Sequence, residues 1–311
     1  VISVKLWDLL HGIPLLGEVP DQDIEITSIS YDTRTLSPGA LFVALPGART
    51  DGAQYIQEAM EKGAAAVLCE QAPEGENVVF CTPDARRALA LVSANWFGHP
   101  GRQLTLVGVT GTNGKTTTAC LIKDMLEKTL RTRAGLIGTI ENQIGSKTLP
   151  AHRTTPESYE IQQLLRQMAD EGCSHVVMEV SSHALVQHRV EGLEFAAGVF
   201  TNLTQDHLDY HGTMENYRAA KGLLFHQCRQ AVLNLDDEAG RWYRDQVACP
   251  VFTYSENKDQ ADLTAKNIRL FPGHVEFEAV SRGEIRRVHL PIPGGFTIYN
   301  ALAAISCGLC L

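Results

Sequence analysis

The sequence has 311 residues, of which 44% are hydrophobic and 20% are charged, and its formal net charge is −9. This length allows two domains with a sizeable core, and the negative charge argues against nucleic acid or an anionic membrane as the main partner. No apolar run approaches the roughly 20 residues that cross a bilayer, and residues 1–10 lack the layout of a signal peptide. The eight cysteines are scattered through apolar segments, as is typical of reduced thiols, so we expect a cytoplasmic protein.

Residues 1–98 are predicted to form a first α/β domain. Apolar runs between turn residues indicate short strands and helices, with strands at 24–31, 40–45, 64–69 and 78–81 and helices at 55–62 and 83–97. This segment contains no glycine-rich phosphate loop. His99-Pro100-Gly101 then interrupts the pattern, so we place the domain boundary there and assign residues 99–311 to a second domain.

The second domain is predicted to be a mainly parallel sheet with helices on both faces. Apolar strands alternate with helical stretches, with strands at 104–109, 134–137, 176–180, 197–200, 231–235 and 251–254 and helices at 116–130, 157–170 and 214–228. From 262 to 290 the pattern alternates with period two between turns, which indicates a small antiparallel element, and a last helix is expected at 298–310. Ligands of such sheets bind beyond the carboxyl ends of the strands.

The most informative segment is Gly111-Thr112-Asn113-Gly114-Lys115-Thr116-Thr117, between a predicted strand and a predicted helix. Glycines let backbone N–H groups approach phosphate oxygens, and the start of a helix adds partial positive charge. In this arrangement we expect Lys115 to reach the β- and γ-phosphates of a nucleotide and Thr116 to offer its hydroxyl to Mg²⁺. Val109 stands where the strict pattern has its first glycine, so the loop is a variant, and a purely structural glycine turn is the alternative.

Two polar clusters follow other predicted strands. Glu179 ends an apolar strand, where an ionised carboxylate is costly unless it binds a cation, so we expect it to bind Mg²⁺; a solvated glutamate is the alternative. The segment 202–211 combines acids and histidines, which makes His207 a candidate for a role at Mg²⁺. Zinc binding by His207 and His211, four residues apart, and a structural polar loop are the alternatives there.

These segments together resemble the Mur ligases, which are ATP-dependent amide-bond-forming enzymes of peptidoglycan synthesis. The resemblance is carried by the loop 111–117, Glu-Val-Ser-Ser-His at 179–183, Asp-His-Leu-Asp-Tyr-His-Gly at 206–212 and Ala219-Ala220-Lys221. The segments at 181–185 and 187–189 are similar to the ligases that add the third peptide residue. Asp32-Thr33-Arg34 and residues 39–52 resemble the UDP-binding domain of that group, so the resemblance covers essentially the whole chain.

The resemblance implies a set of functional residues. It implies that Lys221 is carbamylated (N6-carboxylysine) and holds a second Mg²⁺, whereas the helix around it, taken alone, favours a lysine that extends to the surface. Carbamylation requires a neutral amine and therefore a buried lysine with a shifted pKa. The implied catalytic residues are Lys115, Lys221 and His207, and the implied Mg²⁺ ligands are Thr116, Glu179, His207 and Lys221. ATP is expected on Gly111, Thr112, Asn113, Gly114, Lys115, Thr116, Thr117 and Asn300.

The resemblance also implies a substrate surface. Its expected residues are Tyr31, Thr33, Ala48, Arg49, Thr50, Thr154, Thr155, Ser181, Gln187 and Arg189. Two positions depart from the family pattern, because Arg153 precedes Thr154 where an asparagine is common, and Thr297 stands where an Asn-x-x-Asn pattern ending at Asn300 is usual.

The implied reaction adds a diamino acid (meso-diaminopimelate or L-lysine) to UDP-MurNAc-L-Ala-D-Glu through an acyl phosphate, with ATP and Mg²⁺. The expected partners are these substrates, without nucleic acid or a membrane span, and we expect a monomer. The C-terminal amino-acid-binding domain of the family and its Asp-Asn-Pro-Arg-type signature are absent from these 311 residues, so we expect a truncated ligase that is inactive alone. The alternatives are a fragment that binds nucleotide and UDP-muramoyl peptide without ligase activity, and a ligase similar to folylpolyglutamate synthetase.

Overall fold

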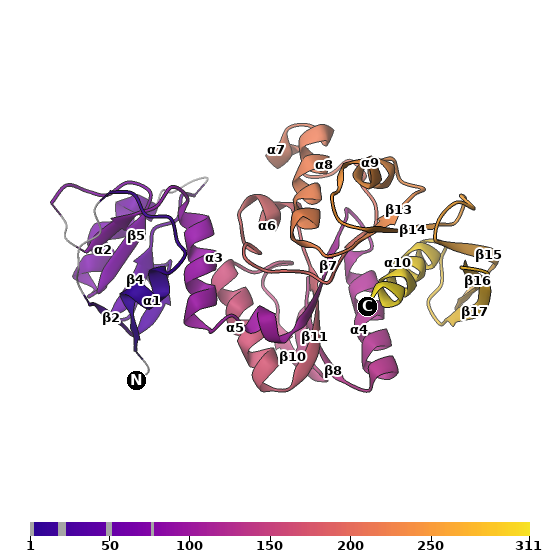
Figure 1. Ribbon diagram of the computed structural model, residues 1–311, viewed down its shortest axis with the longest axis horizontal. Helices are drawn as coiled ribbons and strands as arrows, with labels where there is room; N and C mark the ends of the chain where they lie inside the picture. The colour runs from indigo at the N-terminus through magenta and orange to yellow at the C-terminus, as the bar shows by residue number, and fades with distance from the viewer. Residues whose placement is uncertain (1–2, 18–22, 48–51, 76–77) are drawn as a thin grey trace. The chain divides into compact units, whose positions relative to one another are not determined.

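The chain forms two compact units in a computed structural model, which describes residues 3–17, 23–47, 52–75 and 78–311 (Figure 1). The first unit consists of Val1–Pro100, Glu157–Gln163 and Gln187–Gly192. The second consists of Gly101–Pro156, Leu164–Val186 and Leu193–Leu311. Two short segments from the middle of the sequence therefore belong to the same unit as the N-terminal residues. Within the described ranges, no helix is both long and apolar enough to cross a bilayer.

The first unit is built around a four-stranded parallel sheet in the order β3 (Ser28–Ser30), β4 (Ala40–Val43), β5 (Ala66–Cys69) and β6 (Val79–Cys81). Leu41 and Leu68 pack on one face with α1 (Leu6–Leu10) and α3 (Ala85–Trp96), and Phe42 and Val67 pack on the other with α2 (Ile56–Glu61). Burial on both faces explains why the strands read as continuous apolar runs. The remaining elements are β1 (Val4–Lys5), β2 (Glu25–Ile26) and the 3₁₀ helix η1 (Gly52–Tyr55).

An eleven-stranded sheet forms the centre of the second unit. Its parallel strands, in spatial order, are β8 (Arg133–Ile137), β11 (Cys173–Glu179), β7 (Thr105–Thr110), β12 (Ala197–Phe200), β13 (Ala231–Asn234), β14 (Val251–Ser255) and β15 (Leu263–Leu270). Antiparallel strands continue both edges, with β9 (Glu141–Ile144) and β10 (Lys147–Pro150) beside β8, and β16 (Val275–Ser281) and β17 (Glu284–Leu290) beside β15. This arrangement confirms the predicted α/β class, with a mainly parallel sheet and a small antiparallel element.

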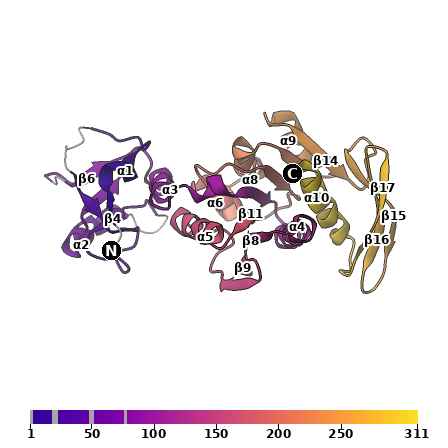
Figure 2. The same ribbon diagram turned by 60° about the horizontal axis from the view of Figure 1, so that its bottom comes forward.

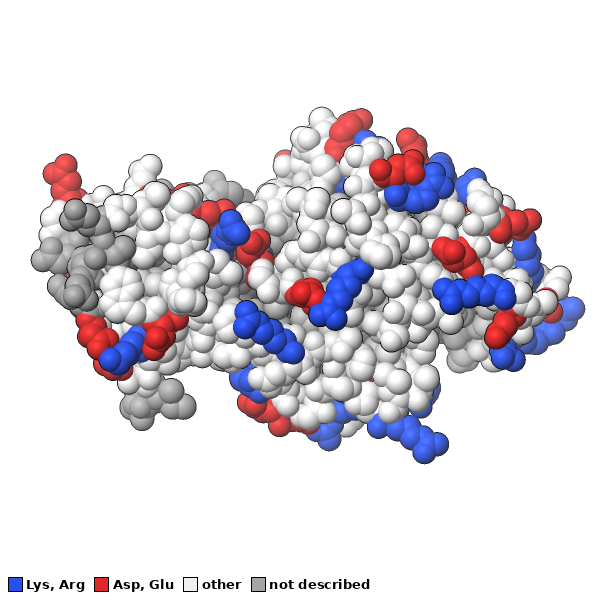
Figure 3. Space-filling view, viewed as in Figure 1, with Lys and Arg blue, Asp and Glu red and all other residues white. Residues whose placement is uncertain are grey.

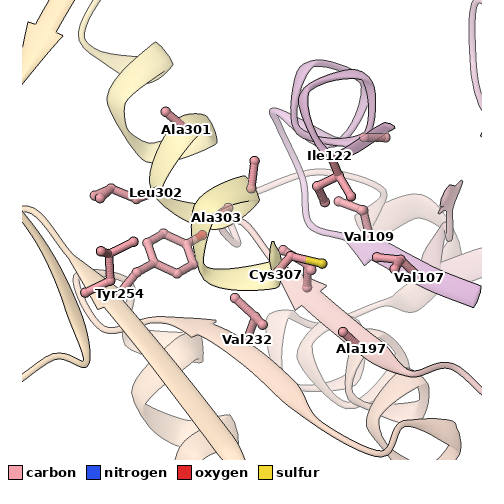
Figure 4. Close-up of a cluster of buried hydrophobic side chains, with 14 of the residues drawn as sticks. Val107, Val109, Ile122, Ala197, Val232, Tyr254, Ala301, Leu302, Ala303 and Cys307 are labelled. Atoms are coloured by element: carbon pink, nitrogen blue, oxygen red, sulfur yellow. The ribbon is translucent and has the colours of Figure 1, made fainter. Parts of the chain in front are cut away.

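Helices cover both faces of the parallel part of this sheet. Figures 1 and 2 show α4 (Lys115–Leu130) and α10 (Phe296–Cys310) side by side, and Figure 4 shows their residues Ile122 and Ala303 with Val107 and Val109 of β7 in one buried cluster. On the other face, Phe225 and Tyr243 pack with Phe200 of β12. The other helices are η2 (Pro100–Gln103), α5 (Ser158–Asp170), α6 (Ser182–Val186), α7 (Leu208–His211), α8 (Met214–Gly222), η3 (Leu223–Gln227) and α9 (Glu238–Gln246).

Several elements differ from the sequence-based expectation, and the single strand expected at 24–31 is divided between β2 and β3 of different sheets. The helix expected at 214–228 ends at Gly222, and the chain tightens into the 3₁₀ helix η3, which buries Leu224 and Phe225. The hairpin of β9 and β10 was not expected, because its residues are mostly polar. Helix α9 was missed for the same reason, although Asp237 accepts a capping hydrogen bond at its start.

Charged side chains of both signs are distributed over the surface. Figure 3 shows Lys and Arg interspersed with Asp and Glu on the face that it presents. The net charge of −9 is therefore not collected into a single acidic patch on that face.

Candidate active site

The loop 111–117 joins β7 to α4, and its two glycines occupy positions that a side chain cannot share. Gly111 has φ +150°, and a Cβ atom there would lie 1.8 Å from Thr201 Oγ1. Gly114 has φ +82°, and a Cβ there would lie 2.4 Å from Asn300 Oδ1. Both positions combine a backbone conformation that favours glycine with a close neighbour. The glycines are therefore required by the fold of the loop, whatever it binds.

The segment that follows β12 holds the loop from one side. Asn202 accepts hydrogen bonds from the N–H groups of Thr112 through its carbonyl (2.8 Å) and of Asn113 through Oδ1 (2.9 Å). Thr201 Oγ1 donates to Asn113 O at 2.7 Å. The first turn of α4 begins directly after this braced part, and its N–H groups point out of the helix start. This geometry suits an anion at the beginning of α4.

Two lysines from distant parts of the sequence converge on one carbonyl. Lys115 Nζ donates to Gly111 O at 2.9 Å and to Thr112 O at 3.0 Å, and Lys221 Nζ donates to Gly111 O at 3.0 Å. Lys221 is 2% exposed. Burial, and then the positive charge of Lys115, lower the pKa of Lys221 to about 7. Burial also lowers the pKa of Lys115. Lys221 is therefore a buried lysine, and the surface position that the helix pattern alone favoured is wrong.

Glu179 lies at the carboxyl end of β11, beside the start of α4. The residue is 1% exposed and accepts hydrogen bonds from Thr116 Oγ1 (3.0 Å), Thr139 N (2.9 Å) and Thr139 Oγ1 (2.9 Å). A Cβ at Gly138 would lie 2.4 Å from Glu179 Oε1, so this glycine leaves room for the carboxylate. The alternative of a solvated glutamate is wrong. Sequence reasoning missed Thr139, although it lies two residues after the end of β8, a strand that neighbours β11.

His207 belongs to a group of aromatic side chains beside α8. Its φ is +51°, its side chain is 49% exposed, and its ring centroid lies 5.0 Å from that of His183. His211 is buried, stacks on Tyr217 with centroids 5.1 Å apart, and has Nε2 2.9 Å from Ser182 Oγ. Within the described residues, these two histidines are not part of any close group of three His, Cys, Asp or Glu side chains, which disfavours the zinc alternative.

A cavity of about 680 Å³ opens beside the loop. Its walls come from the loop, from the ends of β12 and β13 and from the start of α10: Asn113, Gly114, Thr117, Asn202, Thr204, Asn234, Asp236, Asp237, Phe296, Tyr299 and Asn300. Asn300 thus lines this cavity, whereas Thr297 is buried and donates its hydroxyl to Pro293 O. Sequence reasoning missed Asp236, which accepts a hydrogen bond from Tyr299 at 3.0 Å. Its position just after a buried strand was the available signal.

The residues expected to contact the substrate fall into two groups. Thr154, Thr155 and Ser181 belong to the second unit and adjoin Glu179. Thr155 Oγ1 donates to Glu179 O at 2.8 Å and accepts from Ser181 N at 3.0 Å. The hydroxyls of Thr154 and Thr139 lie 3.0 Å apart, and Thr154 can donate here because the Thr139 proton goes to Glu179. This group is therefore continuous with the carboxylate site.

The other group belongs to the first unit and contains Tyr31, Thr33, Gln187 and Arg189. The Tyr31 hydroxyl donates to Glu160 Oε1 at 2.8 Å, and Thr33 is 7% exposed. Arg189 Nη2 donates to Gln187 Oε1 at 2.7 Å. The remaining expected contacts, Ala48, Arg49 and Thr50, lie outside the described residues.

Comparisons with known proteins identify relatives for both units. Residues 109–308 match the family described as "Mur ligase middle domain", and residues 25–94 match "Mur ligase family, catalytic domain". The chain is 42% identical to the UDP-N-acetylmuramoyl-L-alanyl-D-glutamate–2,6-diaminopimelate ligase of Geobacillus thermodenitrificans, over 98% of this chain and 64% of the relative. It is 43% identical to the enzyme of the same name from Clostridium botulinum, over 92% of this chain and 60% of the relative.

Solved structures give a consistent result. A structure titled as a UDP-N-acetylmuramoyl-L-alanyl-D-glutamate–2,6-diaminopimelate ligase superposes with a TM-score of 0.84 at 28% identity, over 99% of this chain and 64% of that one. A folylpolyglutamate synthase from Mycobacterium tuberculosis superposes with a TM-score of 0.56 at 16% identity over 72% of this chain, which shows a shared fold. The chain thus spans 60–64% of the length of these two curated relatives. From the matched domain over residues 109–308, we conclude that the chain belongs to the Mur ligase family.

Proposed function

We propose that this chain carries the ATP-binding and precursor-binding parts of a ligase of peptidoglycan synthesis. In the proposed reaction, a carboxylate of UDP-MurNAc-L-Ala-D-Glu is activated by ATP as an acyl phosphate, and a diamino acid then forms the amide bond. The support comes from the names of the relatives at 42% and 43% identity, combined with the geometry of the loop 111–117. The observation that carries the proposal is the convergence of Lys115 and Lys221 on the Gly111 carbonyl.

The loop and the start of α4 suit the phosphates of ATP. We propose that the N–H groups of the first helical turn and the ammonium group of Lys115 bind phosphate oxygens. The ammonium group of Lys115 is already held at the loop by hydrogen bonds to two carbonyl oxygens. It can exchange these bonds for contacts with phosphate oxygens without leaving the site. Asn300, on the wall of the adjacent cavity, is proposed to contact the nucleoside side of ATP. The positive charge would stabilise the negative charge that develops during phosphoryl transfer.

The side chains at the end of β11 fit Mg²⁺. Glu179 and Thr116 supply carboxylate and hydroxyl oxygens, which are the ligands that this cation prefers. When bound, Mg²⁺ would neutralise phosphate charge. We propose Thr116, Glu179, His207 and a carbamylated Lys221 as Mg²⁺ ligands, with Lys221 holding a second ion. Thr139 orients the Glu179 carboxylate through two hydrogen bonds.

Lys221 fits a carbamate for two physical reasons. Its pKa of about 7 leaves a large share of neutral amine at neutral pH, and only the neutral amine reacts with CO₂. A carbamate is an anion, so it would replace the repulsion between Lys221 and Lys115 by attraction. The carbamate nitrogen also keeps one N–H, which can still donate to Gly111 O. We therefore propose N6-carboxylysine at position 221.

The residues proposed for the precursor are those that the family resemblance implies. Tyr31, Thr33, Ala48, Arg49, Thr50, Gln187 and Arg189 are proposed for its UDP and muramoyl parts, and Thr154, Thr155 and Ser181 for the end that reacts. This extends the proposed division into a precursor-binding domain at 1–98 and an ATP-binding domain at 99–311. The segments 157–163 and 187–192 join the first unit, so we propose that they contribute to precursor binding. A cytoplasmic monomer is the proposed state.

Two measurements test the proposal. Calorimetry should detect binding of ATP with Mg²⁺ and, separately, of UDP-MurNAc-L-Ala-D-Glu; failure of both would contradict the assignment. Incubation with both substrates and diaminopimelate or lysine tests the complete reaction. Because the chain spans 60–64% of its relatives, we propose binding without amide formation by this chain alone. Amide product would show that the chain is a complete ligase.

Carbamylation has its own readout. Protein exchanged into ¹³C-bicarbonate should give a carbamate carbon signal that is lost in Lys221→Ala. Full-length enzyme carrying Lys221→Ala should lose activity and regain part of it with short carboxylates. A wild-type carbamate signal in the alanine variant would remove this part of the proposal.

A further inference from the structure

Three potential metal ligands meet on the antiparallel strands at the far edge of the large sheet. His274 immediately precedes β16, Glu276 lies within β16, and His289 lies opposite Glu276 on β17. Side chains two residues apart on a strand share a face, and directly opposed residues of neighbouring strands are adjacent. The pairing register therefore brings all three side chains together on one face of the sheet.

That face is the one turned away from the hydrophobic core. Val275 and Phe277 point into the core cluster that includes α10, so Glu276, which lies between them in the alternating strand, points outward. Its side chain is 23% exposed, and those of His274 and His289 are 31% and 57% exposed. The group is thus accessible to an ion from solvent while its residues belong to paired strands or adjoin them.

The distances match those of ligands around one small cation. One ligand atom from each residue lies within 4.8 Å of the others. Glu276 Oε1 lies 3.6 Å from His274 Nε2 and 3.4 Å from His289 Nδ1. Tetrahedral zinc with bonds of about 2.0–2.1 Å places its ligand atoms about 3.3 Å apart. Two of the three separations are therefore already close to those of a zinc site.

Neighbouring side chains orient the ligands. Arg287 Nη2 donates to Glu276 Oε2 at 3.0 Å, which leaves Oε1 directed at the two histidines. Phe271 stacks on His274 with ring centroids 4.3 Å apart and an angle of 12°. Such contacts around metal ligands fix their orientation.

We propose that His274, Glu276 and His289 bind one zinc ion. Two imidazoles and one carboxylate are a common protein ligand set for zinc, and the fourth tetrahedral position is left for water or an external group. Because only three ligands come from the protein and Arg287 is nearby, binding is weaker than at a closed structural site. The ion joins β17 to the start of β16 and stabilises this edge of the sheet.

The test is a zinc titration of the chelator-treated full chain with a chromophoric competitor and excess Mg²⁺. Wild-type protein is expected to bind one zinc ion; His289→Gln should weaken binding at least about tenfold, and the double variant His274→Gln/His289→Gln should abolish it. His226→Gln, at an exposed histidine elsewhere, and His207→Gln, at the proposed ligase site, should leave zinc binding unchanged. Equal zinc affinity of the double variant and wild type would overturn the proposal.

Two further measurements distinguish zinc at these three side chains from zinc bound elsewhere on the chain. Co²⁺ in place of zinc should give tetrahedral d–d absorption without a thiolate charge-transfer band, because no cysteine belongs to the site; a thiolate band would contradict it. Zinc should raise the melting temperature of wild type and leave that of the double variant unchanged. Equal melting temperatures of the two proteins without metal would show that the variant is folded, and an equal zinc-induced rise in both would refute the assignment.

Discussion

The loop 111–117 follows a strand of the same sheet that contains the antiparallel strands β16 and β17, yet the two regions place the proposed functional side chains in different ways. In the parallel part, the strands are largely buried, and the proposed site residues lie at their carboxyl ends, at Gly111 and Glu179. In the antiparallel part, one face is buried and the other carries polar side chains such as Glu276. A parallel sheet therefore concentrates function at one edge, whereas an antiparallel extension can place it on a face.

The largest expected effect comes from Gly111→Ala. The new Cβ would overlap Thr201 Oγ1, so we expect a loss of about 3 kcal/mol in unfolding free energy and no detectable ATP binding. Gly283→Ala, in the turn between β16 and β17, is the matched control, because its φ is +80° but no atom lies within 4 Å of the added Cβ. Its cost should be about 1 kcal/mol. If urea unfolding showed the same loss of unfolding free energy in Gly111→Ala and Gly283→Ala, the loop 111–117 would not be the more demanding of the two turns.

Glu179→Gln should weaken Mg²⁺-dependent ATP binding about 100-fold, which is about 2.7 kcal/mol. The change keeps the shape of the side chain and removes the charge that suits a divalent cation. Glu276→Gln applies the same change to the antiparallel strands and should leave calorimetric ATP binding with Mg²⁺ unaltered. If both variants bound MgATP like wild type, the carboxyl end of β11 would not be the magnesium site.

Lys221→Met should change how stability depends on pH. The folded pKa of about 7 lies below the ordinary lysine value of 10.5, so between these pH values the unfolded chain binds more protons. The unfolding free energy of unmodified wild type should therefore rise with pH in this window, by up to about 1.4 kcal/mol per pH unit, and the lysine contribution should level off below pH 7. The variant should lose this rise in CO₂-free buffer. If the unfolding free energies of wild type and Lys221→Met changed with pH in the same way, the pKa of Lys221 would not be lowered in the folded protein.

The smallest expected effect is that of Thr139→Val. This change removes the hydroxyl that donates to Glu179 and keeps the backbone hydrogen bond, so Mg²⁺-dependent ATP binding should weaken about tenfold at most. Thr148→Val, at an exposed position of β10, is the control and should have no effect. A larger loss for Thr139→Val than for Glu179→Gln would reverse the roles assigned to the two residues.

The sequence predicted those parts of the fold that depend on local patterns. The parallel strands are buried apolar runs, and the loop 111–117 has a recognisable order of glycine, lysine and hydroxyl residues, so both could be found. Thr139 and Asp236 were missed because their roles depend on which strands are neighbours, and a single sequence does not give strand order. The burial of Lys221 was likewise not predictable from its helix, because the carbonyl of Gly111 that it meets lies 110 residues away.

The central claim is that the carboxyl ends of β7 and β11 form one site for ATP and Mg²⁺. Calorimetric titration of ATP, with and without Mg²⁺, into wild type, Lys115→Met and His289→Gln tests it most directly. We predict one Mg²⁺-dependent site in wild type and in His289→Gln, and binding at least about tenfold weaker in Lys115→Met. Binding of equal affinity in wild type and Lys115→Met, or no binding by wild type, would contradict the account.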